Sequence, residues 1–287
     1  MGPPITATAK ILSLPGKETW VHAHGIRVRC FLAGQGPPLL LLHGLGEAAI
    51  VWHANIDALA SRHTVAALDL PGHGHSDKPD WRYSLQKSTA FLLDFMDASG
   101  FDQVSLVGNS MGGLMALALT LEHPQRVHKL ILVDSAGLGR QVAGFLRLMS
   151  IPAMGELMAR PTRDSVKWTL RRIFYDYAFA TPQFIEALYQ ERRIPGNKQA
   201  MLKILRYGVN FFGLRPHALL SNRLPCVKAP TLVLWGQQDT IFPASHARHA
   251  AGLLPGAQLH TFDQCGHWPH IEKQEEFNQL VLDFLVS

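Results

Sequence analysis

Residues 103–122 read QVSLVGNSMGGLMALALTLE. The apolar run before Gly108 predicts a buried strand, and the small and apolar residues after Ser110 predict a helix. Gly108, Ser110 and Gly112 fit G-x-S-x-G, the pattern of a sharp strand-to-helix turn that exposes a serine hydroxyl. Ser110 would also stand at a helix N-terminus, where unpaired backbone N–H groups favour negative charge. We therefore predict that Ser110 is a nucleophile above one end of a sheet.

Short apolar strands alternate with helical patterns on both sides of this stretch. The predicted strands lie in PLLLLHG (38–44), TVAALDLPG (64–72), QVSLVGNS (103–110), KLILVDS (129–135), TLVLWGQQD (231–239) and AQLHTFDQCG (257–266), and the predicted helices span 48–60, 85–99, 112–122, 244–254 and 271–284. Ahead of them, WVHAHGIRVRCFLAG predicts a hairpin that turns at His24 and Gly25. Apolar strands separated by helices predict a parallel sheet covered on both faces, with functional loops at the carboxyl ends of its strands.

The alternation is interrupted once, between residues 137 and 222. This stretch has helical spacing in LRRIFYDYAF and PQFIEALYQERRI, and it carries 13 Lys and Arg against 5 Asp and Glu. A loop of this length without secondary structure is improbable in a compact domain. We therefore predict a helical cap at 137–222, inserted into a core domain of residues 1–136 and 223–287. The basic excess indicates either a solvated face or a surface that attracts anionic substrates or lipid.

Two later loops supply partners for the serine. A serine hydroxyl needs a base to remove its proton, and the base needs an orienting carboxylate. Asp239 follows the strand TLVLW, and His267 follows the last strand in CGHW. The order Ser110, Asp239, His267 predicts a catalytic triad. The alternatives are a helix-capping role for Asp239, a structural role for His267, and Asp134, which also ends a strand, as a rival acid.

An oxyanion hole requires two positioned N–H donors. We predict the backbone N–H groups of Met111, directly after the nucleophile, and of Leu45, in the loop HGLG. The sequence predicts neither a metal nor an organic cofactor, because the histidines of HAHG and DLPGHGHS lack the spacing of metal ligands and H-E-x-x-H is absent.

In combination, HGLG (43–46), DLPGHGHSDKP (69–79), GNSMGG (108–113), GQQD (236–239) and CGHW (265–268) resemble the α/β-hydrolase superfamily. The resemblance covers nearly the full chain. It implies an α/β-hydrolase fold: a mostly parallel eight-stranded sheet with helices on both faces and an inserted helical cap.

Within the superfamily the chain is most similar to the branch that holds the meta-cleavage-product hydrolases, which cut carbon–carbon bonds in ring-fission products. GNSMGG, CGHW and the final stretch EEFNQLVLDFL carry this likeness. In that branch a cap arginine binds the substrate carboxylate. The resemblance implies this role for Arg192, with Arg193 as its neighbouring alternative, and places Asn109 and Trp268 at the pocket wall.

One loop departs from that branch. The branch has a G-x-G-P-G-A-like sequence after its HG, whereas this chain has Gly44-Leu45-Gly46-Glu47-Ala48-Ala49. Glu47 is a poor neighbour for an anionic substrate. The first expectation is therefore a carboxylesterase for small to medium acyl chains. The alternative is a C–C bond hydrolase of vinylogous diketone carboxylates, and a non-catalytic ligand receptor on the same fold is a third candidate.

Composition sets further limits. The chain has 287 residues, 47% of them hydrophobic and 17% charged, which is typical of a globular protein. No apolar run reaches the roughly 18 residues that cross a bilayer, and no nucleic-acid-binding motif accompanies the net charge of +5. Residues 1–20 lack the pattern of a secretory signal, and three cysteines are too few for a disulfide framework. We expect a cytoplasmic protein that acts on a small ester or diketone acid, with oligomerisation left open.

Overall fold

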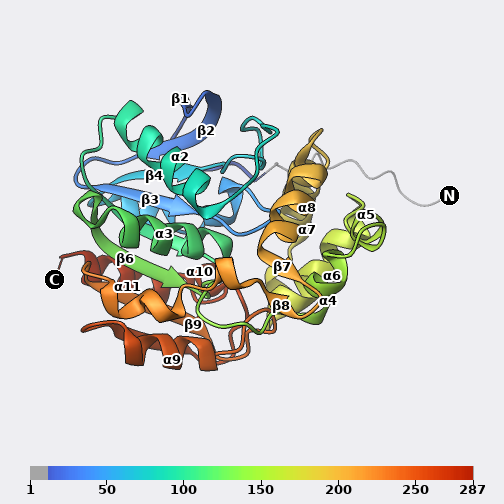
Figure 1. The fold of residues 1–287 in the computed structure, drawn as a ribbon. Helices are drawn as coiled ribbons and strands as arrows, with labels where there is room; N and C mark the ends of the chain where they lie inside the picture. The colour runs from blue at the N-terminus through green and yellow to red at the C-terminus, as the bar shows by residue number, and fades with distance from the viewer. Residues whose placement is uncertain (1–11, 287) are drawn as a thin grey trace.

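A computed structural model describes residues 12–286 (Figure 1). Residues 1–11 hold much of the N-terminal stretch on which the expected cytoplasmic location rests, and they lie outside the described residues. Within 12–286 an eight-stranded sheet has the order β1-β2-β4-β3-β5-β6-β9-β10. Its strands are β1 (Lys17–Ala23), β2 (Ile26–Ala33), β3 (Pro38–Leu42), β4 (Thr64–Leu68), β5 (Val104–Asn109), β6 (Val127–Val133), β9 (Thr231–Gly236) and β10 (Gln258–Phe262).

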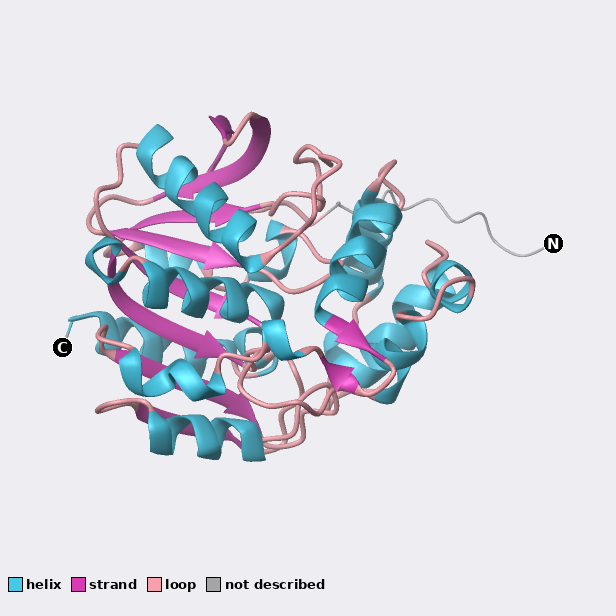
Figure 2. Ribbon diagram, in the orientation of Figure 1, coloured by secondary structure: helices cyan, strands magenta, loops and turns pink. Residues whose placement is uncertain are grey.

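The sheet confirms the expected α/β-hydrolase architecture. All strand pairs from β4 to β10 are parallel, while β1 pairs with β2 and β2 with β4 in antiparallel fashion. The predicted hairpin is present: His24 and Gly25 form its turn, both with positive φ. The carboxyl ends of the parallel strands therefore meet along one edge of the sheet, as Figure 2 shows by the direction of the strand arrows.

Helices cover both faces of the sheet because successive strand residues point to opposite sides. Leu40 and Leu42 of β3 join one apolar cluster, whereas Leu39 and Leu41 join the other. The first cluster packs under α2 (Leu85–Ala98), α3 (Met111–Glu122) and α9 (Ser245–Leu253), and the second under α1 (Ile56–Ala60), α10 (Pro269–Glu272) and α11 (Gln274–Val286). The inner strands β3, β4, β5, β6 and β9 are buried on both faces, as the unbroken apolar strands predicted, whereas the edge strand β10 is largely exposed.

Two predicted helices are divided in the structure. The stretch 48–60 forms a 3₁₀ turn at Ala49–Trp52 and then only α1, and the last helical stretch divides at Lys273 between α10 and α11. Val51 and Trp52 are fully buried beside the sheet. Tertiary packing of these residues outweighs the local preference for one continuous helix.

Between β6 and β9 the chain leaves the sheet. It forms α4 (Gly144–Met149), α5 (Met154–Met158), α6 (Arg163–Ile173), α7 (Pro182–Arg192), α8 (Asn197–Gly208) and the hairpin β7 (Val209–Asn210) to β8 (Gly213–Leu214). Figure 1 shows these helices beside the carboxyl ends of the strands. The stretch LRRIFYDYAF is helical only to Ile173, and Tyr177–Phe179 form a separate 3₁₀ turn.

A buried ion cluster joins this helical segment to the sheet. Arg29 on β2 donates from Nε to Asp69 Oδ2 at 2.6 Å and from Nη2 to Glu191 Oε1 of α7 at 3.0 Å. Asp69 is fully buried and also accepts hydrogen bonds from the backbone N–H groups of Ala49 and His75. Removing the guanidinium would leave a buried carboxylate without its counter-charge.

We expect Arg29→Met to lower the free energy of unfolding by about 3–5 kcal/mol, because breaking a buried ion pair leaves one charge uncompensated. Denaturant unfolding measures this. Arg27→Met, on the same strand, is the matched control, because Arg27 is exposed and its nitrogen lies 3.9 Å from Asp77. It should change stability little. Equal losses in the two variants would contradict the assignment of the buried cluster as a major stabilising contact.

Candidate functional site

The turn between β5 and α3 holds Ser110 in a strained conformation. Its φ is +56° and its ψ is −117°, a region that non-glycine residues rarely adopt. The turn is tight: a Cβ at Gly108 would lie 2.4 Å from the carbonyl oxygen of Gly112, and a Cβ at Gly112 would lie 2.2 Å from that of Leu42. Only glycine permits these approaches, so the spacing of G-x-S-x-G follows from the geometry of the turn.

The structure brings Asp239 and His267 together. His267 Nδ1 and Asp239 Oδ2 are 2.8 Å apart, and both side chains are almost fully buried. The other oxygen of Asp239, Oδ1, accepts a hydrogen bond from the N–H of Ile241 at 2.7 Å. The carboxylate is thus held from both sides, and it orients the imidazole so that Nε2 is the free ring nitrogen.

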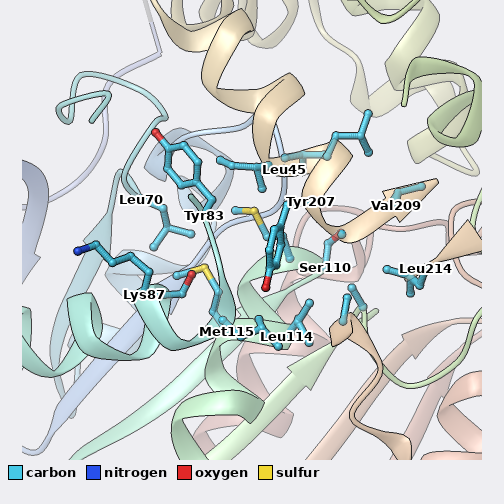
Figure 3. Close-up of a pocket in the computed structure, with 18 of the residues that line it drawn as sticks. Leu45, Leu70, Tyr83, Lys87, Ser110, Leu114, Met115, Tyr207, Val209 and Leu214 are labelled. Atoms are coloured by element: carbon cyan, nitrogen blue, oxygen red, sulfur yellow. The ribbon is translucent and has the colours of Figure 1, made fainter. Parts of the chain in front are cut away.

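Two cavities meet at Ser110. One is apolar and is lined by residues of α2 and α3 on one side and of α8, β7 and β8 on the other; Figure 3 shows a part of its lining. Tyr83, Met115, Tyr207, Val209 and Leu214 are among the residues that line it. Leu45 and Met111 also belong to this wall, so the two expected oxyanion donors come from residues that border the serine. An apolar chain attached to a carbonyl at Ser110 fits this cavity.

The second cavity, which we call the polar cavity, holds the charged and polar groups of Ser110, His267, Glu47 and Arg192, while the rest of its lining is largely apolar. Arg192 is partly buried and donates from Nη1 to the Thr169 hydroxyl at 3.1 Å. Arg193, the neighbouring alternative, is exposed and its guanidinium lies over the Tyr189 ring. Of the two arginines, only Arg192 lines the cavity that holds the serine.

Glu47 brings a carboxyl group into the same cavity. Its Oε2 accepts the N–H of Gly44 at 2.8 Å. Burial raises the pKa of Glu47 to about 7, although His267, the Gly44 N–H and Arg192 each favour its charged form. Burial also lowers the pKa of Arg192, and the carboxylate of Glu47 opposes that shift. The two groups therefore partly compensate each other across the polar cavity.

Asn109 and Trp268 do not line either cavity at Ser110, contrary to the expectation from the resemblance. The amide of Asn109 is buried and donates to the carbonyl oxygens of Val133 and His267, each at 3.2 Å. Trp268 is fully buried, and its ring packs against Phe174 and Phe184. Both residues therefore pack against the surroundings of the site: the amide nitrogen of Asn109 binds backbone carbonyls, and the Trp268 ring packs on other aromatic rings.

Sequence reasoning did not identify Thr169 or Tyr207 as parts of the site. Thr169 lies on α6 within the turns that bury Val166 and Leu170, so a hydroxyl beside the apolar stripe was an available signal. Tyr207 comes near the end of α8, and its place in the apolar cavity depends on how that helix packs on the core. Sequence periodicity does not contain that information.

Comparison with known proteins agrees with this fold. A family profile described as alpha/beta hydrolase fold matches residues 37–274. The chain is 34% identical over 263 residues to the 2-hydroxy-6-oxo-6-phenylhexa-2,4-dienoate hydrolase of Burkholderia cepacia, covering 89% of this chain and 90% of the relative.

Solved structures show the same likeness. The meta-cleavage product hydrolase CumD of Pseudomonas fluorescens IP01 superposes with a TM-score of 0.81 at 26% identity, over 93% of this chain and 97% of CumD. A membrane phospholipase A described as a bacterial virulence factor gives 0.80 at 27% identity, over 94% of this chain and 85% of the phospholipase. Within residues 12–286, every helix is too short or too polar to cross a bilayer.

The pKa of Glu47 is raised only in the folded protein, so the contribution of Glu47 to the free energy of unfolding depends on pH. The folded protein holds this proton more tightly than the unfolded chain. The contribution is therefore fully present below the unfolded pKa of about 4.5 and is lost as the pH rises toward 7, by at most ~1.4 kcal/mol per pH unit. Glu47→Gln should remove this part of the slope.

Chemical denaturation of wild type and Glu47→Gln between pH 4 and 8 measures the difference. The two proteins should be closest in stability near pH 4, where position 47 is neutral in both, and the variant should gain on the wild type up to pH 7. A constant difference across the range would show that the pKa of Glu47 is the same in the folded and the unfolded protein.

Proposed function

Because the chain belongs to the α/β-hydrolase family and is a serine hydrolase, we propose that it hydrolyses the carbon–carbon bond of a vinylogous diketone that carries a carboxylate. The observation that carries this proposal is the position of Arg192 in the same cavity as Ser110 and His267. A planar guanidinium can make paired, charge-assisted hydrogen bonds to a carboxylate. The Burkholderia cepacia relative is named for a substrate of this kind.

The reaction assigns a role to each group of the proposed triad. His267 takes the proton of Ser110, Asp239 stabilises the resulting imidazolium, and the serine oxygen attacks the ketone carbon. The N–H groups of Leu45 and Met111 stabilise the oxyanion. The electron pair of the cleaved bond leaves with the dienoate half, which takes the proton from His267. Water then releases the acyl group from Ser110 as a carboxylic acid.

The two cavities would divide the substrate between them. The dienoate carboxylate would lie in the polar cavity with Arg192, and the acyl half would occupy the apolar cavity. We also propose that residues 137–222 act as the cap, since α6, α7 and α8 contribute Thr169, Arg192 and Tyr207 to the walls around Ser110. A cytoplasmic location fits the free thiols Cys30, Cys226 and Cys265.

Ester hydrolysis is the second candidate, and Glu47 is the observation that favours it. A carboxylate in the polar cavity repels an anionic substrate, and the apolar cavity alone suits the acyl chain of a neutral ester of small to medium length. The same triad and oxyanion hole would serve either substrate. A receptor without turnover would show neither activity.

Ser110→Ala should lower kcat on p-nitrophenyl butyrate, or on a ring-fission dienoate, by at least about 10³-fold, because no other group supplies the nucleophile. Ser105→Ala is the matched control: Ser105 is a buried serine of β5, the strand that leads into the turn, and lies away from the turn itself. It should retain turnover. Labelling by a fluorophosphonate should occur in the wild type and be lost in Ser110→Ala. Undiminished turnover in Ser110→Ala would contradict the assignment of the nucleophile.

Arg192→Ala should lower kcat/KM on the dienoate by about 30- to 1,000-fold, equivalent to roughly 2–4 kcal/mol of lost charge-assisted hydrogen bonding. The neutral butyrate ester makes no such contact, so its turnover should change little. Arg193→Ala controls for loss of a neighbouring positive charge, because Arg193 is exposed.

A wild type that cleaves the butyrate ester and leaves the dienoate intact would support the esterase candidate. Equal losses on both substrates in Arg192→Ala would assign Arg192 to support of the cap instead of carboxylate binding.

A further inference from the structure

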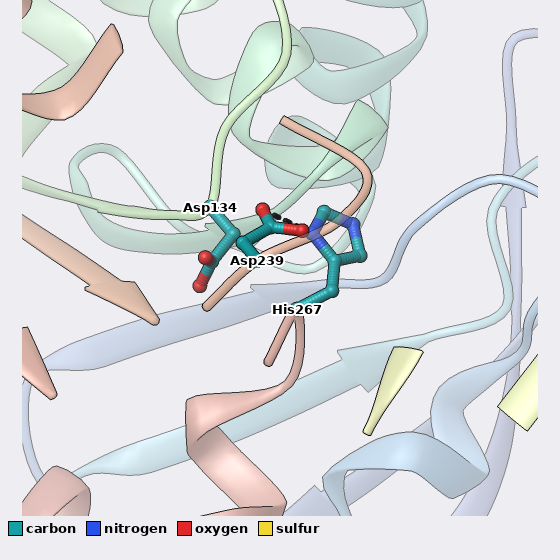
Figure 4. A group of neighbouring side chains, drawn as sticks. All are labelled: Asp134, Asp239 and His267. Carbon is teal, nitrogen blue, oxygen red and sulfur yellow. Dashed lines mark hydrogen bonds and ion pairs between the residues drawn. The ribbon is translucent and has the colours of Figure 1, made fainter. Parts of the chain in front are cut away.

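A second aspartate lies behind the proposed triad. Asp134 follows the last residue of β6, has a φ of +43° and is fully buried. One carboxylate oxygen of Asp134, one of Asp239 and a ring nitrogen of His267 all lie within 4.8 Å of one another. In Figure 4 the Asp239 carboxylate lies between Asp134 and His267. The strand end thus places a carboxyl group against the side of the triad acid that faces away from the histidine.

The hydrogen bonds of the two carboxyl groups are unequal. Both oxygens of Asp239 have partners, the N–H of Ile241 and the imidazole of His267. Oδ1 of Asp134 accepts the N–H of Gly236 at 3.0 Å, but its buried Oδ2 has no donor among the described residues. Two ionised carboxylates so close together and so well buried would repel each other, and one oxygen would remain unsatisfied.

The charged surroundings of Asp134 favour its neutral form. The titratable groups that face it are Asp239 in the loop after β9, Cys265 and His267 after β10, and Glu272 on α10. Burial raises the pKa of Asp134 well above its usual value, and the charges of Asp239 and Glu272 raise it further, while the Gly236 N–H opposes the shift. His267 is the only one of these groups that can carry a positive charge, and Asp239 stands between it and Asp134.

We propose that Asp134 is a positioning residue that keeps a proton on Oδ2 and donates it to the Asp239 carboxylate, so that the pair carries one proton and one negative charge. This inference rests on the proposed triad and applies to either candidate substrate. Asp239 then receives three donors: the Ile241 N–H, the His267 Nδ1–H and the Asp134 O–H. Three donors fix the plane of the carboxylate and therefore the direction of the imidazole.

Two substitutions of Asp134 separate the hydrogen bond from the charge. Asp134→Asn keeps the shape, an N–H donor toward Asp239 and an oxygen for Gly236. Asp134→Ala removes the donor. With p-nitrophenyl butyrate, kcat should fall about 10- to 100-fold in Asp134→Ala, the value of one hydrogen bond to a charged group. In Asp134→Asn it should fall only a few-fold. KM should change little in both, because Asp134 lines neither cavity at Ser110.

The pH profile of kcat/KM tests the location of the proton. If Asp134 is already neutral, Asp134→Asn leaves the midpoint of the acid limb in place. If Asp134 is ionised, removing a negative charge this close to His267 should move that midpoint down by about one pH unit or more. Such a shift would overturn the proposal, and so would equal activity of Asp134→Ala and Asp134→Asn. Should Asp134→Ala fail to fold, the profile of Asp134→Asn decides alone.

Two controls complete the design. Asp69→Asn removes another buried carboxylate at a strand end, one that is paired with Arg29; it should lower the melting temperature and leave the acid limb in place. Metal analysis of wild type and Asp134→Asn tests whether a metal ion, instead of a proton, lies between the carboxyl groups. A stoichiometric divalent ion present only in the wild type would overturn the proposal of a shared proton. If Ser110→Ala retains full turnover, the proposed triad fails, which is a different result from any change at Asp134.

Discussion

The close approach of the β5–α3 turn to strand β3 is the constraint on which the rest of the site depends. Gly112 packs its Cα against the carbonyl oxygen of Leu42, so the start of α3 lies directly beside the end of β3. The loop that follows β3 carries Leu45 and Glu47, and the turn carries Ser110 and Met111. A larger residue at position 112 would separate these two loops, and with them the serine from Leu45, one of its two expected oxyanion donors.

The core of this arrangement was predictable because it is local. The apolar strands and the G-x-S-x-G turn are local features of the sequence, and each proposed triad residue lies in a loop soon after a predicted strand. Ser110, Asp239 and His267 therefore appear in the sequence as one residue per loop. The sheet is confirmed in its class and strand number. The helix boundaries at 48–60 and 271–284 were wrong; in the first stretch, buried side chains such as Trp52 set the backbone.

The walls of the cavities were less predictable because they depend on packing between distant segments. Asn109 and Trp268 were expected at the pocket, but their side chains serve the backbone of the His267 loop and an aromatic cluster. Whether Arg192 or Arg193 faces the site depends on the rotation of α7 against the core, which the Arg29–Glu191 contact helps to fix. Asp134 could be recognised as a polar strand end, but its partner Asp239 is 105 positions away in the numbering.

Glu47, Arg192 and further charged residues line the polar cavity, whereas the apolar cavity, which also borders Ser110, has little polar surface. The serine thus stands at a boundary between two environments. This contrast would orient a substrate with one charged end and one apolar end, because placing the charged end in the apolar cavity costs free energy. The orientation in turn decides which bond of the substrate faces the nucleophile.

The helical segment is fastened to the core at the position of the histidine. The N–H of His267 donates to the carbonyl oxygen of Ile173 at the end of α6, at 2.7 Å. Glu272 accepts the N–H groups of Gly266, Tyr175 and Asp176 and so ties the same two loops together. If the helical segment between β6 and β9 were exchanged with that of a relative, residues 173–176 would therefore have to be kept. A chimera with a junction within these residues would change the specificity and also displace the imidazole of His267.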